Sequence, residues 1–310
     1  MNITIIIPTY NRKNILKKCV MALYGQNYPP SDYEIIIVDD GSKDGTEEMV
    51  GSLQNHCYCP LRLFVQKNRG PASARNVGIT HAKGDILLFL GDDIIATADL
   101  IKRHSELHTR YPGDHIAVLG HVTWSPEIRI THLMRWLESS GVQFGYGTIK
   151  DPEDVPFNYF YTSNVSVKKR FLQNHGLFDE DFPYAAWEDI ELAFRLSFKG
   201  LQIVYEDKAL AYHEHPVNGK SLVRRSRLVG RAMAIFHKKH PEAKEVIKPI
   251  RTLCSKLFKM VPLWCPPSFM AEWIPKRHLH AYYNCLITRH IEAGYHDEEN
   301  VSRGTERVAI

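Results

Sequence analysis

Residues 34–42 read Glu-Ile-Ile-Ile-Val-Asp-Asp-Gly-Ser, and residues 85–93 read Asp-Ile-Leu-Leu-Phe-Leu-Gly-Asp-Asp. In both stretches a short apolar run ends in a turn that carries two neighbouring aspartates. Runs of this length and composition are typical of buried strands. Ligands of open α/β sheets bind at the carboxyl ends of the strands, so the two acidic turns predict a polar site at one edge of a sheet.

The chain on either side of these stretches alternates between strand and helix patterns. Apolar residues recur at helical spacing from Ile15 to Leu23, a second helix is expected from Asp44, and Gly70-Pro71 opens a third. The remaining predictions are strands over residues 3–7, 61–66, 160–167 and 202–205, and a helix over residues 187–198. This alternation predicts βαβ units that build a mostly parallel sheet in an α/β fold.

The composition is that of an ordinary folded protein, with 44% hydrophobic and 24% charged residues in a chain of 310. The net charge of +4 is mild and does not indicate a nucleic-acid partner. Twelve Lys or Arg residues lie between Lys220 and Lys259, against only Glu242 and Glu245. This basic region predicts either an anionic neighbour, such as a lipid surface or an acidic acceptor, or a solvated helix face.

The six cysteines form neither paired CxxC motifs nor the disulfide framework of a small secreted domain, which favours a reducing compartment. The N-terminus lacks the charged segment and the long apolar run of a secretory signal, so we expect a cytoplasmic protein. Residues 257–274 are largely apolar but contain Pro262, Pro266 and Pro267. We expect this segment either to rest at a membrane interface, at the inner face, or to pack on the α/β domain.

The acidic turns carry the groups that a metal–diphosphate complex requires. Asp93 can hold Mg²⁺ or Mn²⁺ through a carboxylate oxygen while a diphosphate supplies most of the other ligands, and Asp92 is expected to contact a ribose or a metal-bound water. The alternative is an ordinary acidic turn, because Gly and Asp are favoured in turns. The second turn, Asp39-Asp40, favours the functional interpretation, since clustered carboxylates repel unless a cation or hydrogen-bond donors offset their charge.

Trp187-Glu188-Asp189 lies at a predicted helix N-terminus, where acidic residues are also expected because they complement the helix dipole. The tryptophan can stack on a sugar ring, and a carboxylate there can take the proton of a hydroxyl that attacks an anomeric carbon. Attack from the face opposite a leaving diphosphate predicts inversion at that carbon. His213 follows a strand and is expected either to complete a metal site or to be structural.

Six motifs occur in the order of a known family. They are Ile-Ile-Pro-Thr-Tyr-Asn-Arg at 6–12, Val-Asp-Asp-Gly-Ser at 38–42, Gly-Pro-Ala-Ser-Ala-Arg-Asn-Val-Gly at 70–78, Phe-Leu-Gly-Asp-Asp at 89–93, Asn-Val-Ser-Val at 164–167 and Trp-Glu-Asp-Ile-Glu-Leu-Ala-Phe-Arg-Leu at 187–196. Together they resemble glycosyltransferase family 2, a family of inverting enzymes with the GT-A fold. One departure is that the family's Asp-x-Asp triplet here reads Gly91-Asp92-Asp93.

The resemblance implies a role for each candidate residue. The residues implied to bind the donor nucleotide are Pro8, Thr9, Tyr10, Asp39, Asp40, Arg75 and Asp92. Asp93 and His213 would hold Mn²⁺ or Mg²⁺, and Asp189 would act as the general base. Glu188 would help to place the acceptor, and Trp187 would contact it.

The sequence therefore predicts a metal-assisted, inverting glycosyltransferase that moves a sugar from a nucleotide diphosphate donor, foremost a UDP-sugar, to a hydroxyl of a glycan or lipid-linked acceptor. The alternative is a nucleotide-sugar-binding protein without turnover, in which Gly91 marks a degenerate metal site. We expect a GT-A domain over residues 1–216 and a basic, mainly helical extension over residues 217–310. Peripheral membrane association and homo-oligomerisation are both open for that extension.

Overall fold

The computed structural model describes residues 1–55, 58–245 and 276–308. The chain forms two compact units, the first comprising Met1–Ile128 with Gly141–His215 and the second Arg129–Ser140 with Pro216–Ile310. The predicted boundary between a GT-A domain (1–216) and a C-terminal extension (217–310) lies beside the boundary between these units at residues 215 and 216. The assignment of separate functions to the two parts stays a prediction. The apolar segment 257–274 and the part of the basic region beyond residue 245 lie outside the described residues.

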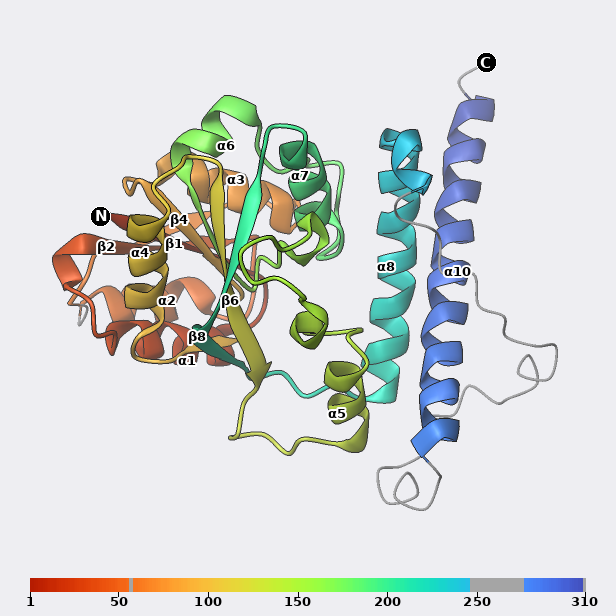
Figure 1. Ribbon diagram of the computed structural model, residues 1–310, viewed down its shortest axis with the longest axis horizontal. Helices are drawn as coiled ribbons and strands as arrows, with labels where there is room; N and C mark the ends of the chain where they lie inside the picture. Colours follow the sequence, from red (N-terminus) through yellow and green to blue (C-terminus); the bar gives the residue numbers. More distant parts are fainter. Residues whose placement is uncertain (56–57, 246–275, 309–310) are drawn as a thin grey trace. The chain divides into compact units, whose positions relative to one another are not determined.

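The first unit is built on an eight-stranded sheet that is flanked by helices (Figure 1). The strands are β1 (Ile3–Thr9), β2 (Tyr33–Asp39), β3 (Leu61–Val65), β4 (Ile86–Leu90), β5 (Ile94–Ala96), β6 (Ile116–Trp124), β7 (Asn164–Lys168) and β8 (Gln202–His213). They lie in the order β3-β2-β1-β4-β7-β6-β8-β5. β1 to β4 pair in parallel, as do β6 and β8, whereas β7 is antiparallel to both of its neighbours and β5 to β8. The predicted α/β fold is confirmed.

The apolar runs form the centre of this sheet. β2 is buried along its whole length and β1 almost so, which suits isoleucine-rich strands that are covered on both faces. The helices of this unit are α1 (Lys13–Tyr24), α2 (Thr46–Gln54), α3 (Pro71–His81), α4 (Leu100–Arg110), α6 (Lys169–His175) and α7 (Glu188–Ser197). A Cβ atom added at Gly78 would lie 2.5 Å from Cγ2 of Ile6, so glycine lets α3 approach β1 closely.

Two strand predictions need correction. The strand predicted over residues 160–167 begins only at Asn164, because the backbone N–H groups of Phe160 and Tyr161 donate to carbonyls within residues 157–159 and are used in turns. β8 continues from the predicted strand at 202–205 as far as His213. A bulge in its pairing with β6 lets β8 follow that strand to its last residue, Trp124.

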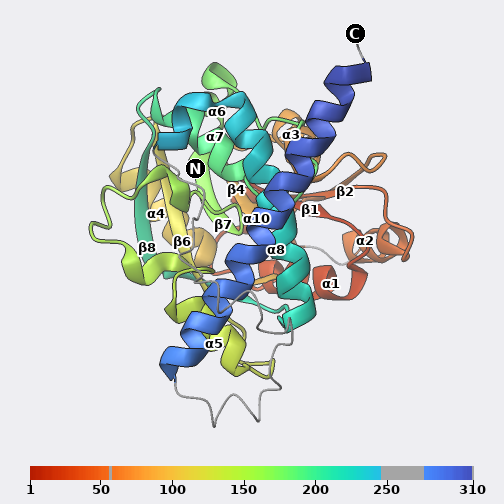
Figure 2. The ribbon, with the colours of Figure 1, turned by 90° about the vertical axis from the view of Figure 1, so that its right-hand side faces the viewer.

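The second unit contains α5 (His132–Ser139), α8 (Gly219–Lys239) and α10 (Lys276–Val308). α8 and α10 lie side by side in both Figure 1 and Figure 2. A Cβ added at Gly230 would lie 1.9 Å from the carbonyl oxygen of Ile291, and one added at Gly294 would lie 2.0 Å from that of Arg227. Only glycine fits at these positions, so the two backbones are in direct contact.

α5 joins this helical pair through an aromatic contact. Nε1 of Trp136 donates to Nδ1 of His280 at 3.0 Å, and the Trp136 ring lies 4.9 Å from that of Tyr283, centroid to centroid. Across the described ranges, none of the helices combines the length and the apolar character needed to cross a membrane.

Candidate active site

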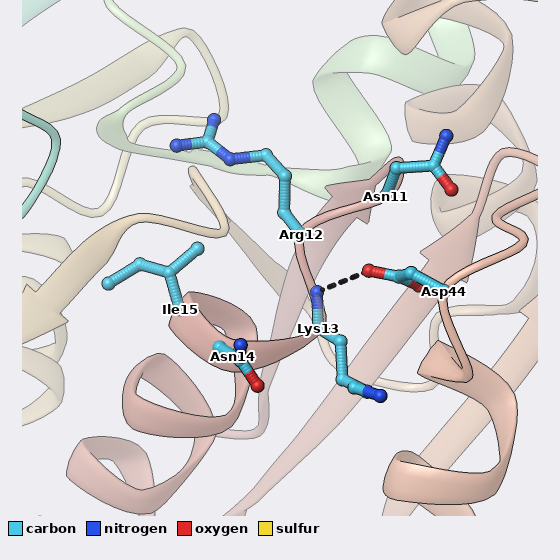
Figure 3. Close-up of a pocket in the computed structure, with 6 residues that line it drawn as sticks. All are labelled: Asn11, Arg12, Lys13, Asn14, Ile15 and Asp44. Carbon is cyan, nitrogen blue, oxygen red and sulfur yellow. Dashed lines mark hydrogen bonds between the residues drawn. The ribbon is translucent and has the colours of Figure 1, made fainter.

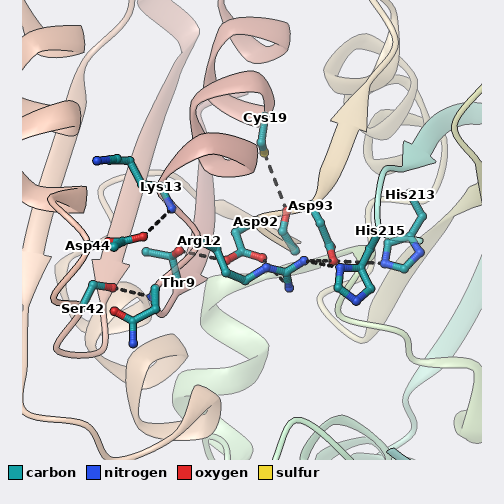
Figure 4. Close-up of polar contacts among 12 residues, drawn as sticks. Thr9, Arg12, Lys13, Cys19, Ser42, Asp44, Asp92, Asp93, His213 and His215 are labelled. Carbon is teal, nitrogen blue, oxygen red and sulfur yellow. Dashed lines mark hydrogen bonds and ion pairs between the residues drawn. The ribbon is translucent and has the colours of Figure 1, made fainter. Parts of the chain in front are cut away.

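Asp92 and Asp93 follow the buried strand β4 and form ion pairs with Arg12, in the turn between β1 and α1 (Figure 4). Arg12 Nη2 lies 2.7 Å from Asp93 Oδ2 and 3.0 Å from Nδ1 of His215. Arg12 Nη1 lies 3.2 Å from Asp92 Oδ1, and the hydroxyl of Thr9 donates to Asp92 Oδ2 at 2.8 Å. One guanidinium therefore forms ion pairs with two adjacent buried carboxylates.

The two aspartates differ in their electrostatics. Burial, and then the charge of Asp93, raise the pKa of Asp92 to about 7 against the opposing effects of Arg12 and Thr9. Burial also acts to raise the pKa of Asp93, but His213 and Arg12 together outweigh it and hold that pKa well below its usual range. Within the pair, the negative charge is therefore favoured on Asp93.

β8 brings His213 to the same cluster. His213 pairs with Trp124 across β8 and β6, and its Nε2 lies 3.1 Å from Oδ2 of Asp93. The other ring nitrogen, Nδ1, is buried and has no hydrogen-bond partner within the part of the chain that the structure describes. The pair thus presents a carboxylate oxygen and an imidazole nitrogen side by side, and both atom types can bind a divalent cation.

The sequence treats Asp39 and Asp40 alike, but their environments differ. The carboxylate of Asp40 accepts from Nε2 of Gln66 at 2.7 Å and from the backbone N–H groups of Arg69 at 2.8 Å and Gly70 at 2.9 Å. It therefore fixes the turn that leads into α3. Asp39 accepts at 2.9 Å from the backbone N–H of Ser42, within its own turn. The predicted nucleobase contact stays a prediction for both, and the geometry favours Asp39.

The turn after β1 presents the other residues expected to bind a nucleotide. Tyr10 follows Pro8-Thr9, and with 48% of its surface exposed its ring is free to stack on a flat ligand. The backbone N–H of Asn11 donates to Oγ of Ser42 at 2.7 Å, and Oδ1 of Asn11 accepts from the backbone N–H of Lys43 at 2.8 Å. These bonds join the turns that follow β1 and β2.

A second acidic pair lies at the start of α7. Oε1 of Glu188 accepts from Nη1 of Arg75 at 2.8 Å, and both side chains are buried. Burial, and then the charge of Asp189, raise the pKa of Glu188 to about 7 despite Arg75. Oδ2 of Asp189 lies 3.4 Å from both the backbone nitrogen and Oγ1 of Thr162. Bonds of this length are weak, so Asp189 keeps acceptor capacity for another donor. The nucleotide contact expected of Arg75 stays a prediction.

Strand register relates the two acidic pairs. The antiparallel ladder between β4 and β7 ends at Leu90, which is opposite Asn164. Asp92 lies two residues beyond Leu90, and Thr162 lies two residues before Asn164, so this register places them at the same end of the neighbouring strands. Because Thr162 contacts Asp189, Asp189 lies at the sheet edge that carries Asp92.

Backbone strain is concentrated around this edge. Three non-glycine residues in the described ranges have positive φ: Asn11 at 52°, Phe144 at 59° and Trp187 at 70°. Asn11 precedes Arg12, the Phe144 ring packs edge-on against His213 at 5.4 Å between centroids, and Trp187 directly precedes Glu188. Such conformations cost about 1–2 kcal/mol each and cluster at functional sites. Their positions independently indicate a ligand site here.

An open pocket of about 330 Å³ lies beside the first turn of α1 (Figure 3). Its lining residues are Asn11, Arg12, Lys13, Asn14, Ile15 and Asp44. The backbone N–H of Lys13 donates to Oδ2 of Asp44 at 2.9 Å. Arg12 therefore belongs both to this pocket and to the Asp92–Asp93 cluster.

Sequence reasoning misses two residues of the site, Arg12 and Thr162. The available signal for Arg12 is its place at the end of the first family motif, directly after the turn that follows β1. Thr162 carries no such signal, because its contact with Asp189 depends on where α7 meets the start of β7.

An α/β sheet with paired carboxylates at this edge is the architecture of the GT-A glycosyltransferases. Residues 4–162 match the model of glycosyl transferase family 2. The chain belongs to this family of transferase enzymes.

Curated relatives agree with this assignment. The chain is 28% identical over 267 residues to the uncharacterized glycosyltransferase YfnE of Bacillus subtilis (strain 168), covering 72% of this chain and 67% of YfnE. It is 28% identical over 258 residues to a validoxylamine A glucosyltransferase of Streptomyces hygroscopicus subsp. limoneus, covering 71% and 54%. It is 25% identical over 301 residues to a chondroitin synthase of Escherichia coli, covering 88% and 43%. The match thus spans between 43% and 67% of the lengths of these relatives.

Solved structures resemble the fold. The mannosyltransferase PcManGT from Pyrobaculum calidifontis, in complex with GDP-Man and Mn²⁺, aligns with a TM-score of 0.68 at 19% identity, covering 95% of this chain and 86% of that one. Residues 1–349 of TarS from S. aureus, in complex with UDP-GlcNAc, align with a TM-score of 0.56 at 17% identity, covering 98% and 92%. At these identities the likeness establishes the GT-A fold.

Proposed function

We propose that the protein is a metal-assisted, inverting glycosyltransferase that moves a sugar from a nucleotide diphosphate donor, first of all a UDP-sugar, to a hydroxyl of a glycan or lipid-linked acceptor. The observation that carries the proposal is the shared sheet edge of the Asp92–Asp93 cluster and Asp189, which the register of β4 and β7 and the Thr162 contact support. Inverting transfer needs these two functions together: charge neutralisation at the leaving group and a base for the attacking hydroxyl.

On the donor side, the exposed ring of Tyr10 stacks on the nucleobase, and the carboxylate of Asp39 accepts one of its N–H groups. Thr9 keeps Asp92 in place through the 2.8 Å hydrogen bond, so Asp92 faces the ribose or a metal-bound water. The nucleotide sugars bound in the two similar structures, GDP-Man and UDP-GlcNAc, support this class of ligand.

The protein side chains supply only some of the ligands that a divalent cation needs. Oδ2 of Asp93 and Nε2 of His213 are 3.1 Å apart, which is close to the spacing of two neighbouring ligands on one ion with bonds of about 2.1 Å. Among residues 1–55, 58–245 and 276–308, no group of three His, Cys, Asp or Glu side chains could hold an ion. Asp93 and His213 would therefore hold Mn²⁺ or Mg²⁺ together with diphosphate oxygens, and the cation would supply positive charge for the leaving group.

On the acceptor side, Oδ2 of Asp189 takes the proton of the acceptor hydroxyl. The hydroxyl oxygen forms the new bond to the anomeric carbon, the bond from that carbon to the diphosphate oxygen breaks, and the diphosphate leaves with the electron pair. Attack and departure occur on opposite faces, so the anomeric configuration inverts. Glu188, held by Arg75, positions Asp189 and the acceptor, and the Trp187 ring offers a stacking surface for the acceptor sugar.

The test combines donor binding with turnover in wild type and Asp189→Asn. UDP, GDP and dTDP are titrated calorimetrically with and without Mn²⁺, and turnover is followed as nucleotide release from the matching sugar donors with a panel of glycan acceptors. We expect metal-dependent binding of one nucleotide in both proteins and a loss of turnover of about 10²–10⁴-fold in Asp189→Asn. Asp207→Asn, which alters an exposed carboxylate on β8, serves as the control and should retain wild-type turnover.

Each result has a direct meaning. Wild-type turnover in Asp189→Asn would refute its role as base. Metal-dependent nucleotide binding by the wild type with no turnover of any donor would favour the alternative, a nucleotide-sugar-binding protein with a degenerate site at Gly91. Retention of the anomeric configuration in the product, followed by NMR, would exclude the direct displacement.

A further inference from the structure

We propose that Arg12 is a placeholder for the divalent cation: its guanidinium pairs with Oδ2 of Asp93 until the metal and the diphosphate arrive together. The inference rests on the proposed function, because it takes Asp93 as a metal ligand. In this inference Arg12 makes the binding of the metal depend on the binding of the nucleotide, which the acidic residues alone cannot do.

The first step is competition for a single atom. Oδ2 of Asp93 is 2.7 Å from Nη2 of Arg12 and 3.1 Å from Nε2 of His213. A cation bonded to this oxygen at about 2.1 Å, on the side that faces Arg12, would overlap the guanidinium group. Two positive charges this close also repel strongly in a partly buried site. The cation and the guanidinium therefore exclude one another at Asp93.

The second step concerns which partner can leave. When Arg12 departs, Asp92 keeps its bond from Thr9, and His213 stays beside Asp93, where both would contact the cation. The side chains of Asp92 and Asp93 are 8% and 12% exposed, whereas that of Arg12 is 33% exposed and also lines the open pocket beside α1. The Arg12 side chain can therefore turn away from both carboxylates while Asp92 and Asp93, at the end of β4, stay in place.

The third step is compensation by the donor. A cation that binds alone must break the ion pairs of Arg12 and leave the guanidinium without an anion. A cation that binds with a nucleoside diphosphate brings phosphate oxygens, which are the preferred bidentate partners of a guanidinium. Cation and nucleotide should consequently bind cooperatively, and the protein should hold the metal only weakly in the absence of a donor.

The experiment measures Mn²⁺ affinity by calorimetry, first with Mn²⁺ alone and then at saturating UDP, in wild type, Arg12→Met, Arg12→Lys and Lys13→Met. Without UDP we expect Arg12→Met to bind Mn²⁺ roughly 10-fold or more tightly than wild type, because a charge-assisted bond no longer opposes the ion. Arg12→Lys should fall between the two. UDP should increase the Mn²⁺ affinity of Arg12→Met by a smaller factor than that of wild type.

Lys13→Met is the matched control, since it removes the same charge from the neighbouring residue, whose backbone N–H donates to Asp44. Its Mn²⁺ affinity should equal that of wild type, and an increase as large as that of Arg12→Met would overturn the inference in favour of a general charge effect. Equal Mn²⁺ affinities in wild type and Arg12→Met would also overturn it. If Arg12→Met does not fold, as judged by circular dichroism, the comparison of Arg12→Lys with wild type decides.

A further outcome separates this inference from the proposed function. Absence of Mn²⁺ binding to all four proteins, even with UDP, would overturn the placeholder role, while turnover of wild type and Asp189→Asn in the presence and absence of EDTA would still decide whether sugar transfer occurs.

Discussion

Replacing Asp40 by asparagine should destabilise the protein, with little direct effect on nucleotide contacts. The carboxylate of Asp40 accepts three hydrogen bonds, two through Oδ1 and one through Oδ2. In asparagine the amide oxygen can keep the Oδ1 partners, but the NH₂ group then faces the backbone N–H of Gly70. One bond to a charged group, of about 1.5–3 kcal/mol, is lost, and a buried N–H is left without an acceptor. We expect the free energy of unfolding to fall by about 3 kcal/mol.

The assay is urea denaturation followed by tryptophan fluorescence, paired with UDP titration. Asp39→Asn is the control, because its amide oxygen can still accept from Ser42 and its unfolding free energy should change by less than about 1 kcal/mol. If Asp39 contacts the nucleobase, Asp39→Asn should instead weaken UDP binding. Wild-type stability in Asp40→Asn together with weakened UDP binding would refute the assignment of Asp40 to the turn before α3.

Two further predictions concern pH and helix packing. The folded-state pKa of Glu188 is raised to about 7, so the folded state binds more protons than the unfolded state between about pH 4.3 and 7. Stability should therefore fall by up to about 4 kcal/mol as pH rises through this window. Denaturation of Glu188→Gln should lack this component, and parallel pH profiles of the two proteins would contradict it. Gly230→Ala should cost about 1–3 kcal/mol, because its Cβ would meet the backbone of α10, whereas Gly51→Ala in α2 has open space and should stabilise by about 0.5–1 kcal/mol in thermal unfolding. Equal shifts in melting temperature for the two alanine variants would show that α8 and α10 can separate at no cost.

The fold follows from features that single segments carry. The isoleucine runs of β1 and β2 and the acidic turn after β4 are local patterns, and each is found where the pattern predicts it. The start of β7 could not be predicted, because Phe160 and Tyr161 have the composition of a strand while their backbone N–H groups are used in turns. The extension of β8 to His213 depends on pairing with β6, which no local pattern reveals.

In the candidate site, the sequence identifies residues but does not reveal which side chains contact each other. Asp39 and Asp40 are adjacent, and the sequence cannot say which one points to the turn over residues 66–70, because that turn comes from the far end of β3. The link of Arg75 to Glu188 joins the second turn of α3 to the first residue of α7, which is distant in the chain. The residue types of a site can thus be predicted from motifs, whereas its internal pairings depend on how the elements meet.

The left-handed backbone of Trp187 has a consequence for how this protein can change over time. At φ 70° and ψ −14°, glycine or asparagine would suit the backbone better than a bulky aromatic residue. Backbone strain alone would therefore favour glycine or asparagine at this position, whereas the proposed acceptor contact would retain the indole. Under the proposed acceptor contact, position 187 is thus a point at which the conformational preference of the backbone and sugar transfer favour different residues.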